Sequence, residues 1–154
     1  MEKTVSRSQN PALEPLDILV GDWDMEVSHA SFLPNASETL TGHITVEWRE
    51  GGAFLAISMG SKPSGTPEAI WLISRDTSTL HYTVLYYDAR KVSRVYGMSF
   101  AEGVWKMWRS SPDFSQRFEG KVSGDGNTIT AYWEKSNDSL TWEHDFDVTY
   151  TKAR

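Results

Sequence analysis

Cysteine is absent from this chain, and no apolar run is long enough to cross a membrane as a helix. Without thiols the protein cannot form disulfides, use a thiolate nucleophile or hold zinc through sulfur. Basic residues are also scarce, because 15 Lys and Arg stand against 21 Asp and Glu, a formal net charge of −6. An acidic chain repels phosphate backbones, so nucleic acid is not an expected partner, and neither is a membrane.

Signals for export and for common enzymes are missing as well. Residues 1–11 are polar and aperiodic, so we expect a flexible tail there and, without a secretory signal, a cytoplasmic protein. There is no Gly-x-Ser-x-Gly motif, and the glycine-rich segment 124–127 joins two predicted strands instead of preceding a helix. These absences favour a binding protein over an enzyme.

A period of two residues dominates the chain after Gly21. Trp23, Met25 and Val27, for example, alternate with acidic or polar residues, as in a half-buried strand. Turn-type residues separate the alternating segments. Ten strands are predicted, at 21–28, 40–48, 53–60, 69–75, 80–88, 92–100, 104–110, 114–122, 128–135 and 141–151.

Short connections between the strands predict antiparallel neighbours throughout. Ten strands in one open sheet would expose two edges and a wide apolar face, which closure into a barrel removes. A sandwich of two sheets is the alternative, but it needs longer crossovers than we find. We therefore predict an all-β domain over residues 12–154. It is a single ten-stranded antiparallel up-and-down barrel with a short helical turn at 12–20, which Pro15 limits in length.

The last predicted strand shows the clearest alternation. Five bulky residues are expected to face the barrel axis, and the polar residues between them are expected to face solvent. The inward set is Trp142, His144, Phe146, Val148 and Tyr150. His144 is therefore a candidate to contact a ligand, although a core histidine satisfied by its neighbours explains the same pattern.

Nineteen aromatic residues could either fill the barrel or line a pocket for a flat apolar molecule. Arg94 alternates with Tyr96 on one strand face and would need an anionic partner if that face is the lumen, whereas on the outer face it is an ordinary surface arginine. The inward face of 104–110 is undecided, because both faces are apolar. No histidines are spaced for a metal site. The candidate ligand-binding residues are His144, Arg94, Tyr96, Tyr86, Trp108 and Trp133.

The segment Leu16–Trp23 resembles the start of calycin barrels, in which a Gly-x-Trp motif opens the first strand. The resemblance implies that Trp23, after Gly21, plugs one end of the barrel, and that Lys152 or Arg154 packs over it. Four further segments, at 87–90, 103–105, 114–118 and 142–146, resemble a bacterial family of uncharacterised calycin-like proteins, of the DUF1579 type. That resemblance implies a barrel and no particular activity. More distant similarity extends to nitrobindins, fatty-acid-binding proteins and lipocalins.

Three functions remain open at this stage. The first is binding of a small apolar or amphiphilic molecule in the lumen, without a cofactor. The second is a haem-binding, nitrobindin-like protein with His144 as the proximal ligand, since one imidazole can hold the iron. The third is a filled barrel acting as an interaction scaffold. A homodimer is compatible with any of them, because apolar strand faces could form an interface.

Overall fold

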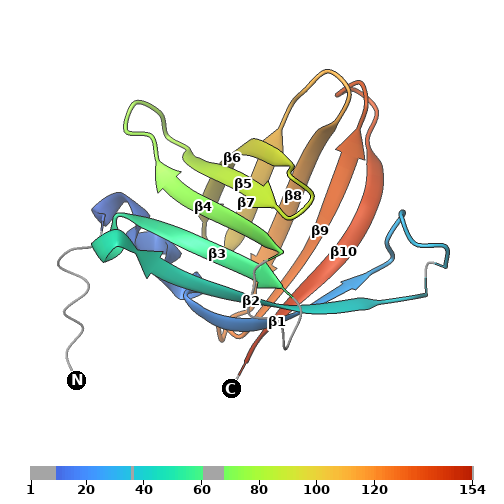
Figure 1. The fold of residues 1–154 in the computed structure, drawn as a ribbon. Helices are drawn as coiled ribbons and strands as arrows, with labels where there is room; N and C mark the ends of the chain where they lie inside the picture. The colour runs from blue at the N-terminus through green and yellow to red at the C-terminus, as the bar shows by residue number, and fades with distance from the viewer. Residues whose placement is uncertain (1–9, 36, 61–67, 154) are drawn as a thin grey trace.

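A closed barrel of ten antiparallel strands makes up most of the protein (Figure 1). The computed structural model describes residues 10–35, 37–60 and 68–153. The strands are β1 (Gly21–Ser28), β2 (Leu40–Arg49), β3 (Phe54–Gly60), β4 (Ala69–Arg75), β5 (Tyr82–Asp88), β6 (Ser93–Ala101), β7 (Val104–Arg109), β8 (Ser115–Val122), β9 (Thr128–Ser136) and β10 (Glu143–Lys152).

Each strand pairs with its neighbours in sequence, and β1 pairs with both β2 and β10, which closes the sheet. The predicted fold class is thereby confirmed. Short turns such as Glu102–Gly103 link several of the consecutive strands, which favours antiparallel order. Closure leaves no free edge in the sheet that the described residues form.

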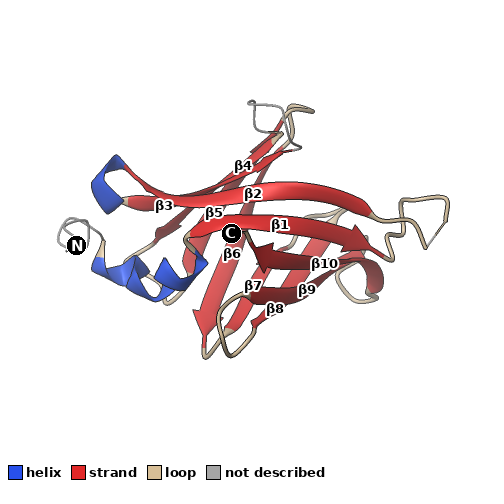
Figure 2. Ribbon diagram, turned by 90° about the horizontal axis from the view of Figure 1, so that it is seen from below, coloured by secondary structure: helices blue, strands red, loops and turns tan. Residues whose placement is uncertain are grey.

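One end of the barrel is covered by η2, a 3₁₀ helix over Pro11–Leu19 (Figure 2). The Asn10 side chain accepts a hydrogen bond from the backbone N–H of Ala12 and so caps the helix. Three leucines of η2 are almost fully buried against the barrel: Leu13, Leu16 and Leu19. A shorter 3₁₀ turn, η3 (Glu50–Gly52), joins β2 to β3 at the same end. Residues 1–9 of the predicted tail lie outside the described residues, whereas Asn10 and Pro11, also assigned to the tail, cap and begin η2.

The half of the barrel nearest η2 is a packed core. Leu55, Ile73, Val84 and Met98 come from β3, β4, β5 and β6, and each is 0% exposed. Trp105 of β7 is 3% exposed beside them. Side chains packed this densely leave no room for a ligand. We call the opposite end, where β1, β3, β5, β7 and β9 finish, the open end.

The predicted facing of the last strand is wrong at its beginning. Phe146 lies opposite Trp133, but His144 lies opposite Glu134, so two steps along β10 match one step along β9. The extra residue of this β-bulge is Asp145, which is buried at 8% exposure. Phe146, Val148 and Tyr150 keep the inward facing that their alternation predicts. Before the bulge the facing is reversed, so Trp142, which was also expected to face the axis, lies on the outer face beside the Arg117 guanidinium.

Candidate functional site

Register settles which faces of β6 and β7 point inward. Arg94 lies opposite Tyr86, and Tyr96 lies opposite Val84, so both share the inward face of β6. On β7 the inward residues are Trp105, Met107 and Arg109, because Met107 pairs with buried Phe118 of β8. The undecided face of 104–110 is therefore assigned, and Arg94 points into the lumen.

Four rings meet across the middle of the barrel, and we call them the aromatic layer: Trp71, Tyr86, Tyr96 and Trp133. The ring centroids of Trp71 and Trp133 are 6.0 Å apart, although β4 and β9 stand on opposite sides of the barrel. Tyr96 lies 5.5 Å from Trp71 and 5.8 Å from Trp133. Tyr86 makes an edge contact with Trp71 at 4.6 Å. The layer separates the packed core from the open end.

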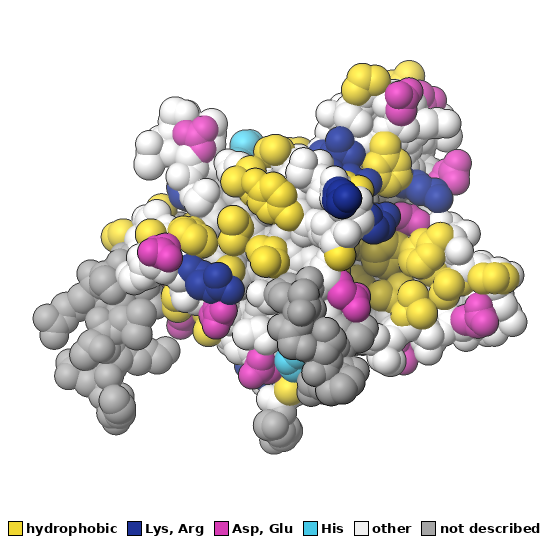
Figure 3. All heavy atoms as spheres, viewed as in Figure 1, with side chains coloured by type: hydrophobic (Ala, Val, Ile, Leu, Met, Phe, Trp, Pro, Cys, Tyr) yellow, Lys and Arg dark blue, Asp and Glu magenta, His cyan; other side chains and the backbone are white. Residues whose placement is uncertain are grey.

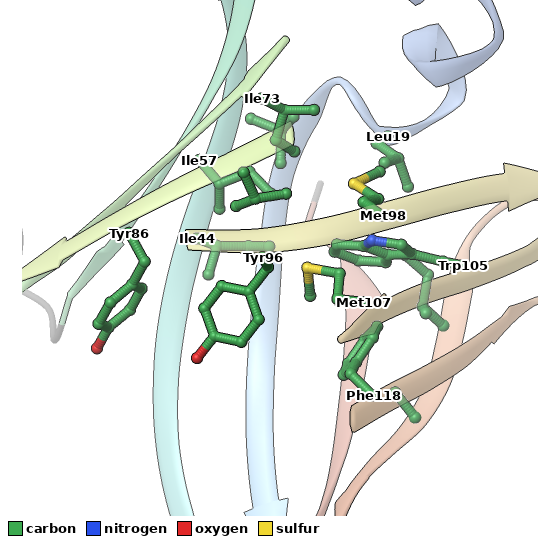
Figure 4. Close-up of a cluster of buried hydrophobic side chains, with 14 of the residues drawn as sticks. Leu19, Ile44, Ile57, Ile73, Tyr86, Tyr96, Met98, Trp105, Met107 and Phe118 are labelled. Carbon is green, nitrogen blue, oxygen red and sulfur yellow. The ribbon is translucent and has the colours of Figure 1, made fainter. Parts of the chain in front are cut away.

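Both tyrosines of the aromatic layer direct their hydroxyls toward the open end, away from Leu19 (Figure 4). The Tyr96 hydroxyl donates to Gln116 Oε1 at 2.6 Å. Burial raises the pKa of Tyr96, and the positive charges of Arg94 and Arg109 partly offset that effect. The Tyr86 hydroxyl donates to Asp88 Oδ2 at 2.7 Å. Burial, followed by this carboxylate, raises the pKa of Tyr86 to about 12.

Side chains at and beside the aromatic layer on its open side are partly exposed. Trp71 of the layer, Met59 of β3 and Phe146 of β10 have intermediate exposure, whereas Leu55, Ile73 and Met98 below the layer are 0% exposed. Hydrophobic and basic side chains gather on the face seen in Figure 3. We call the part of the lumen between the aromatic layer and the open end the open half. It is the candidate binding site.

Two arginines project into the open half. The guanidinium carbons of Arg94 and Arg109 lie 5.0 and 6.0 Å from the centre of the Phe114 ring. Arg109 Nη1 also donates to the Phe114 carbonyl oxygen at 3.0 Å. Within the described part of the chain, neither guanidinium has a carboxylate within 4.0 Å. Both guanidinium groups therefore lie beside aromatic rings without a carboxylate in ion-pair contact.

His144 is on the outer surface, contrary to the sequence expectation. Its side chain is 44% exposed, and its Nε2 lies 2.8 Å from Asp147 Oδ1. The other oxygen of Asp147 lies 2.9 Å from Nδ1 of His29 at the end of β1. The β-bulge at Asp145 causes this reversal. An imidazole in this position does not face the lumen, so the haem hypothesis loses its geometric basis.

Trp108 also lies on the outer face, contrary to its inclusion among the lumen candidates. It pairs across the sheet with Gly97 and covers that glycine. A Cβ placed on Gly97 would come within 2.5 Å of Trp108 Nε1. His81 makes an edge contact with the same indole at 5.1 Å. A bare glycine opposite a large ring explains why β7 carries apolar residues on both faces.

The end of the barrel nearest η2 is closed by Trp23, which is 1% exposed. Its indole Nε1 donates to the Leu19 carbonyl oxygen at 2.9 Å. Lys152 Nζ lies 4.4 Å from the centre of the Trp23 ring and donates to the Val20 carbonyl oxygen. Gly21 has a φ of +138° and allows the Lys152 chain to pass close by. Of the two basic residues considered from the sequence, Lys152 occupies this position, and Arg154 lies outside the described residues.

A shallow groove of about 690 Å³ runs along the outside of β1. Its walls include Asp24, Glu26 and Thr41, with Thr149 and Thr151 from β10. His43 lies 3.4 Å from Asp22 and 3.5 Å from Asp24 on the same face. No group of His, Asp and Glu in the described ranges is arranged to hold a metal ion. This acidic outer face has the properties of a solvated surface.

Sequence reasoning did not single out Trp71, Arg109, Gln116 or Phe114 as site residues. Trp71 was considered only as one of several bulky aromatics. Arg109 could have been found from the alternation of β7 had the inward face of that strand been known. Phe114 was expected to begin the strand 114–122, but β8 begins at Ser115, so alternation within that strand does not place the Phe114 ring. No helix in residues 10–35, 37–60 or 68–153 is long and apolar enough to span a membrane.

Comparison with known proteins adds little to this geometry. No family model matches the sequence, and no curated protein matches it. The crystal structure of Rv2717c from M. tuberculosis is similar at a TM-score of 0.49 and 11% sequence identity, over 95% of this chain and 99% of that chain. Such a likeness carries no argument about function. Fold and site together define a closed ten-stranded β-barrel with an open, arginine-bearing end, and the family resemblance stays a prediction.

Proposed function

We propose that the protein binds a small apolar or amphiphilic molecule in the open half of the barrel. The observation that carries this proposal is the contrast in exposure across the aromatic layer. Leu55, Ile73 and Met98 below the layer are 0% exposed, whereas Trp71 of the layer and the neighbouring Met59 and Phe146 keep part of their surface exposed. Apolar side chains that converge inward and stay partly exposed are typical of ligand sites.

The expected affinity follows from the area that such a ligand would bury. A two-ring aromatic compound would lose about 200 Å² of apolar surface, which contributes about 5 kcal/mol. This free energy corresponds to a dissociation constant on the order of 0.1 mM before any polar contact is counted. Polar atoms beside the aromatic layer, such as the Gln116 amide and the Tyr86 hydroxyl, would orient the molecule.

Titration of the purified protein with the neutral compound 2-naphthamide tests the proposal. Tryptophan fluorescence should change saturably, because Trp71 and Trp133 belong to the aromatic layer. The variant Met59→Trp should weaken binding by filling the open half. Tyr132→Trp is the matched control, since Tyr132 is 37% exposed and lies opposite Asp147 on the outer face.

Absence of saturable binding up to the solubility limit of the compound would contradict the proposed function. It would favour the third hypothesis, a filled barrel that acts as an interaction scaffold. Equal binding by Met59→Trp and wild type would also count against a site in the open half.

A further inference from the structure

Two arginines at the open end, Arg94 and Arg109, differ from their neighbours in having no carboxylate partner among the described residues. Two other cations there have acidic partners: Arg90 pairs with Asp88, and Lys135 lies near Asp145. Arg94 and Arg109 have none within 4.0 Å among the residues that the structure describes. The open half therefore holds two guanidinium groups without a carboxylate in ion-pair contact, in a chain whose net charge is −6.

The Phe114 ring does not account for these two guanidinium groups. A ring face attracts a cation but offers no oxygen to the N–H donors of arginine. Arg109 uses one donor on the Phe114 carbonyl oxygen, and Arg94 directs one toward the Tyr96 hydroxyl. Each guanidinium carries five N–H donors in a planar fork that matches the oxygens of a carboxylate or phosphate. Donors therefore remain for an oxyanion between β6 and β7.

The aromatic layer limits the size of what can bind below the arginines. Trp71 and Trp133 approach to 6.0 Å across the full width of the barrel. Beyond them Ile73, Val84 and Met98 are 0% exposed. A long alkyl chain has no path toward η2, whereas a flat ring can lie against the layer.

Resting on the function proposed above, we propose that the bound molecule is a compact aromatic oxyanion, held by Arg94 and Arg109 at its charged group and by the aromatic layer at its ring. The charge and the ring make separate contributions. The apolar contact provides basal affinity, and the two guanidinium groups provide selectivity for an anion over its neutral analogue.

Wild-type protein with a set of matched probes provides the first test. By calorimetry, 2-naphthoate should bind at least 10-fold more tightly than 2-naphthamide, because a charge-assisted hydrogen bond exceeds a neutral one. A parallel titration with 2-naphthyl phosphate distinguishes a carboxylate ligand from a phosphate ligand, because the site should bind the matching one of the two probes more tightly. Palmitate should bind more weakly than 2-naphthoate, since the alkyl chain cannot pass the aromatic layer.

Variants provide the second test. Arg94→Gln and Arg109→Gln should each weaken 2-naphthoate binding about 10-fold and leave 2-naphthamide binding within about 2-fold. Arg94→Lys keeps the charge but not the fork and should lose less. Arg49→Gln is the matched control, because Arg49 lies on the outer face of β2 at the η2 end and pairs with Glu47. It should bind both probes as wild type does.

The outcomes separate this inference from the function on which it rests. If 2-naphthamide binds as tightly as 2-naphthoate, or if both arginine variants bind 2-naphthoate normally, the anion site is refuted and the apolar site stands. If palmitate binds more tightly than 2-naphthoate, the limit on ligand size is wrong. If neither naphthalene probe binds, the proposed function fails as well.

Discussion

Removal of the Trp23 side chain should destabilise the protein far more than removal of an outer tryptophan. Trp23 is 1% exposed and closes the barrel beneath Lys152. Truncation of a buried tryptophan to alanine costs about 3–5 kcal/mol. The Leu19 carbonyl oxygen would also lose its indole donor, which adds about 1 kcal/mol. The expected loss of about 4–6 kcal/mol is a large part of the 5–15 kcal/mol by which domains are typically stable.

Urea unfolding followed by far-UV circular dichroism measures this loss. Trp108→Ala is the matched control, because it removes the same side chain from the outer face, with an expected cost of about 1–2 kcal/mol. If Trp23→Ala does not fold, Trp23→Phe keeps most of the volume and should still cost about 1–2 kcal/mol through the lost hydrogen bond. Equal losses for Trp23→Ala and Trp108→Ala would refute the assignment of inner and outer faces.

Three further predictions concern single contacts. Gly97→Ala should lower the free energy of unfolding by about 1–3 kcal/mol, because the added Cβ would lie 2.5 Å from the Trp108 indole. Gly124→Ala is the control in the same urea assay and should be close to neutral, because a Cβ there has nothing within 4 Å. Tyr96→Phe should lower the free energy of unfolding by about 1–3 kcal/mol, because it leaves the buried Gln116 side chain without its hydrogen-bond donor. Adding Gln116→Leu to this variant should recover part of the loss. If the losses of the two single variants simply add in the double variant, the hydrogen bond between Tyr96 and Gln116 does not contribute as proposed. Hydrogen bonds, that from Arg90 foremost, lower the pKa of Asp88 in the folded protein. The ionised Asp88 carboxylate therefore stabilises the fold above its unfolded pKa near 4, and this contribution is lost as the pH falls below that value. Asp88→Asn should make the free energy of unfolding fall less steeply with decreasing pH in this range, and an unchanged pH dependence would contradict this role.

Strand alternation predicted most of the fold, because each strand has one buried and one solvated face. β1 illustrates this, with Trp23 and Val27 buried and Asp22, Asp24 and Glu26 exposed. Closure followed from the short turns and the number of strands. Alternation failed where a contact distant in sequence changed the register. The Ser31 backbone N–H donates to the Asp145 carbonyl oxygen at 2.7 Å, and its hydroxyl donates to the Asp145 carboxylate.

The candidate site was predicted less completely than the fold. Arg94, Tyr96, Tyr86 and Trp133 do face inward, since each lies in a regular stretch of its strand. Trp108 was misplaced because alternation cannot distinguish two apolar faces of β7. Arg109 and Arg94 lie near the same Phe114 ring only because both face inward on the neighbouring strands β6 and β7. No local sequence pattern could reveal that proximity.

Nuclear magnetic resonance of the tryptophan indole N–H groups tests the binding site most directly. The chain has seven tryptophans, and each indole gives one signal that single substitutions can assign. Addition of 2-naphthoate should shift the signals of Trp71 and Trp133 and leave those of Trp23 and Trp108 in place. Shifts confined to Trp108 and Trp142 would place the ligand on the outer surface and contradict a site inside the barrel.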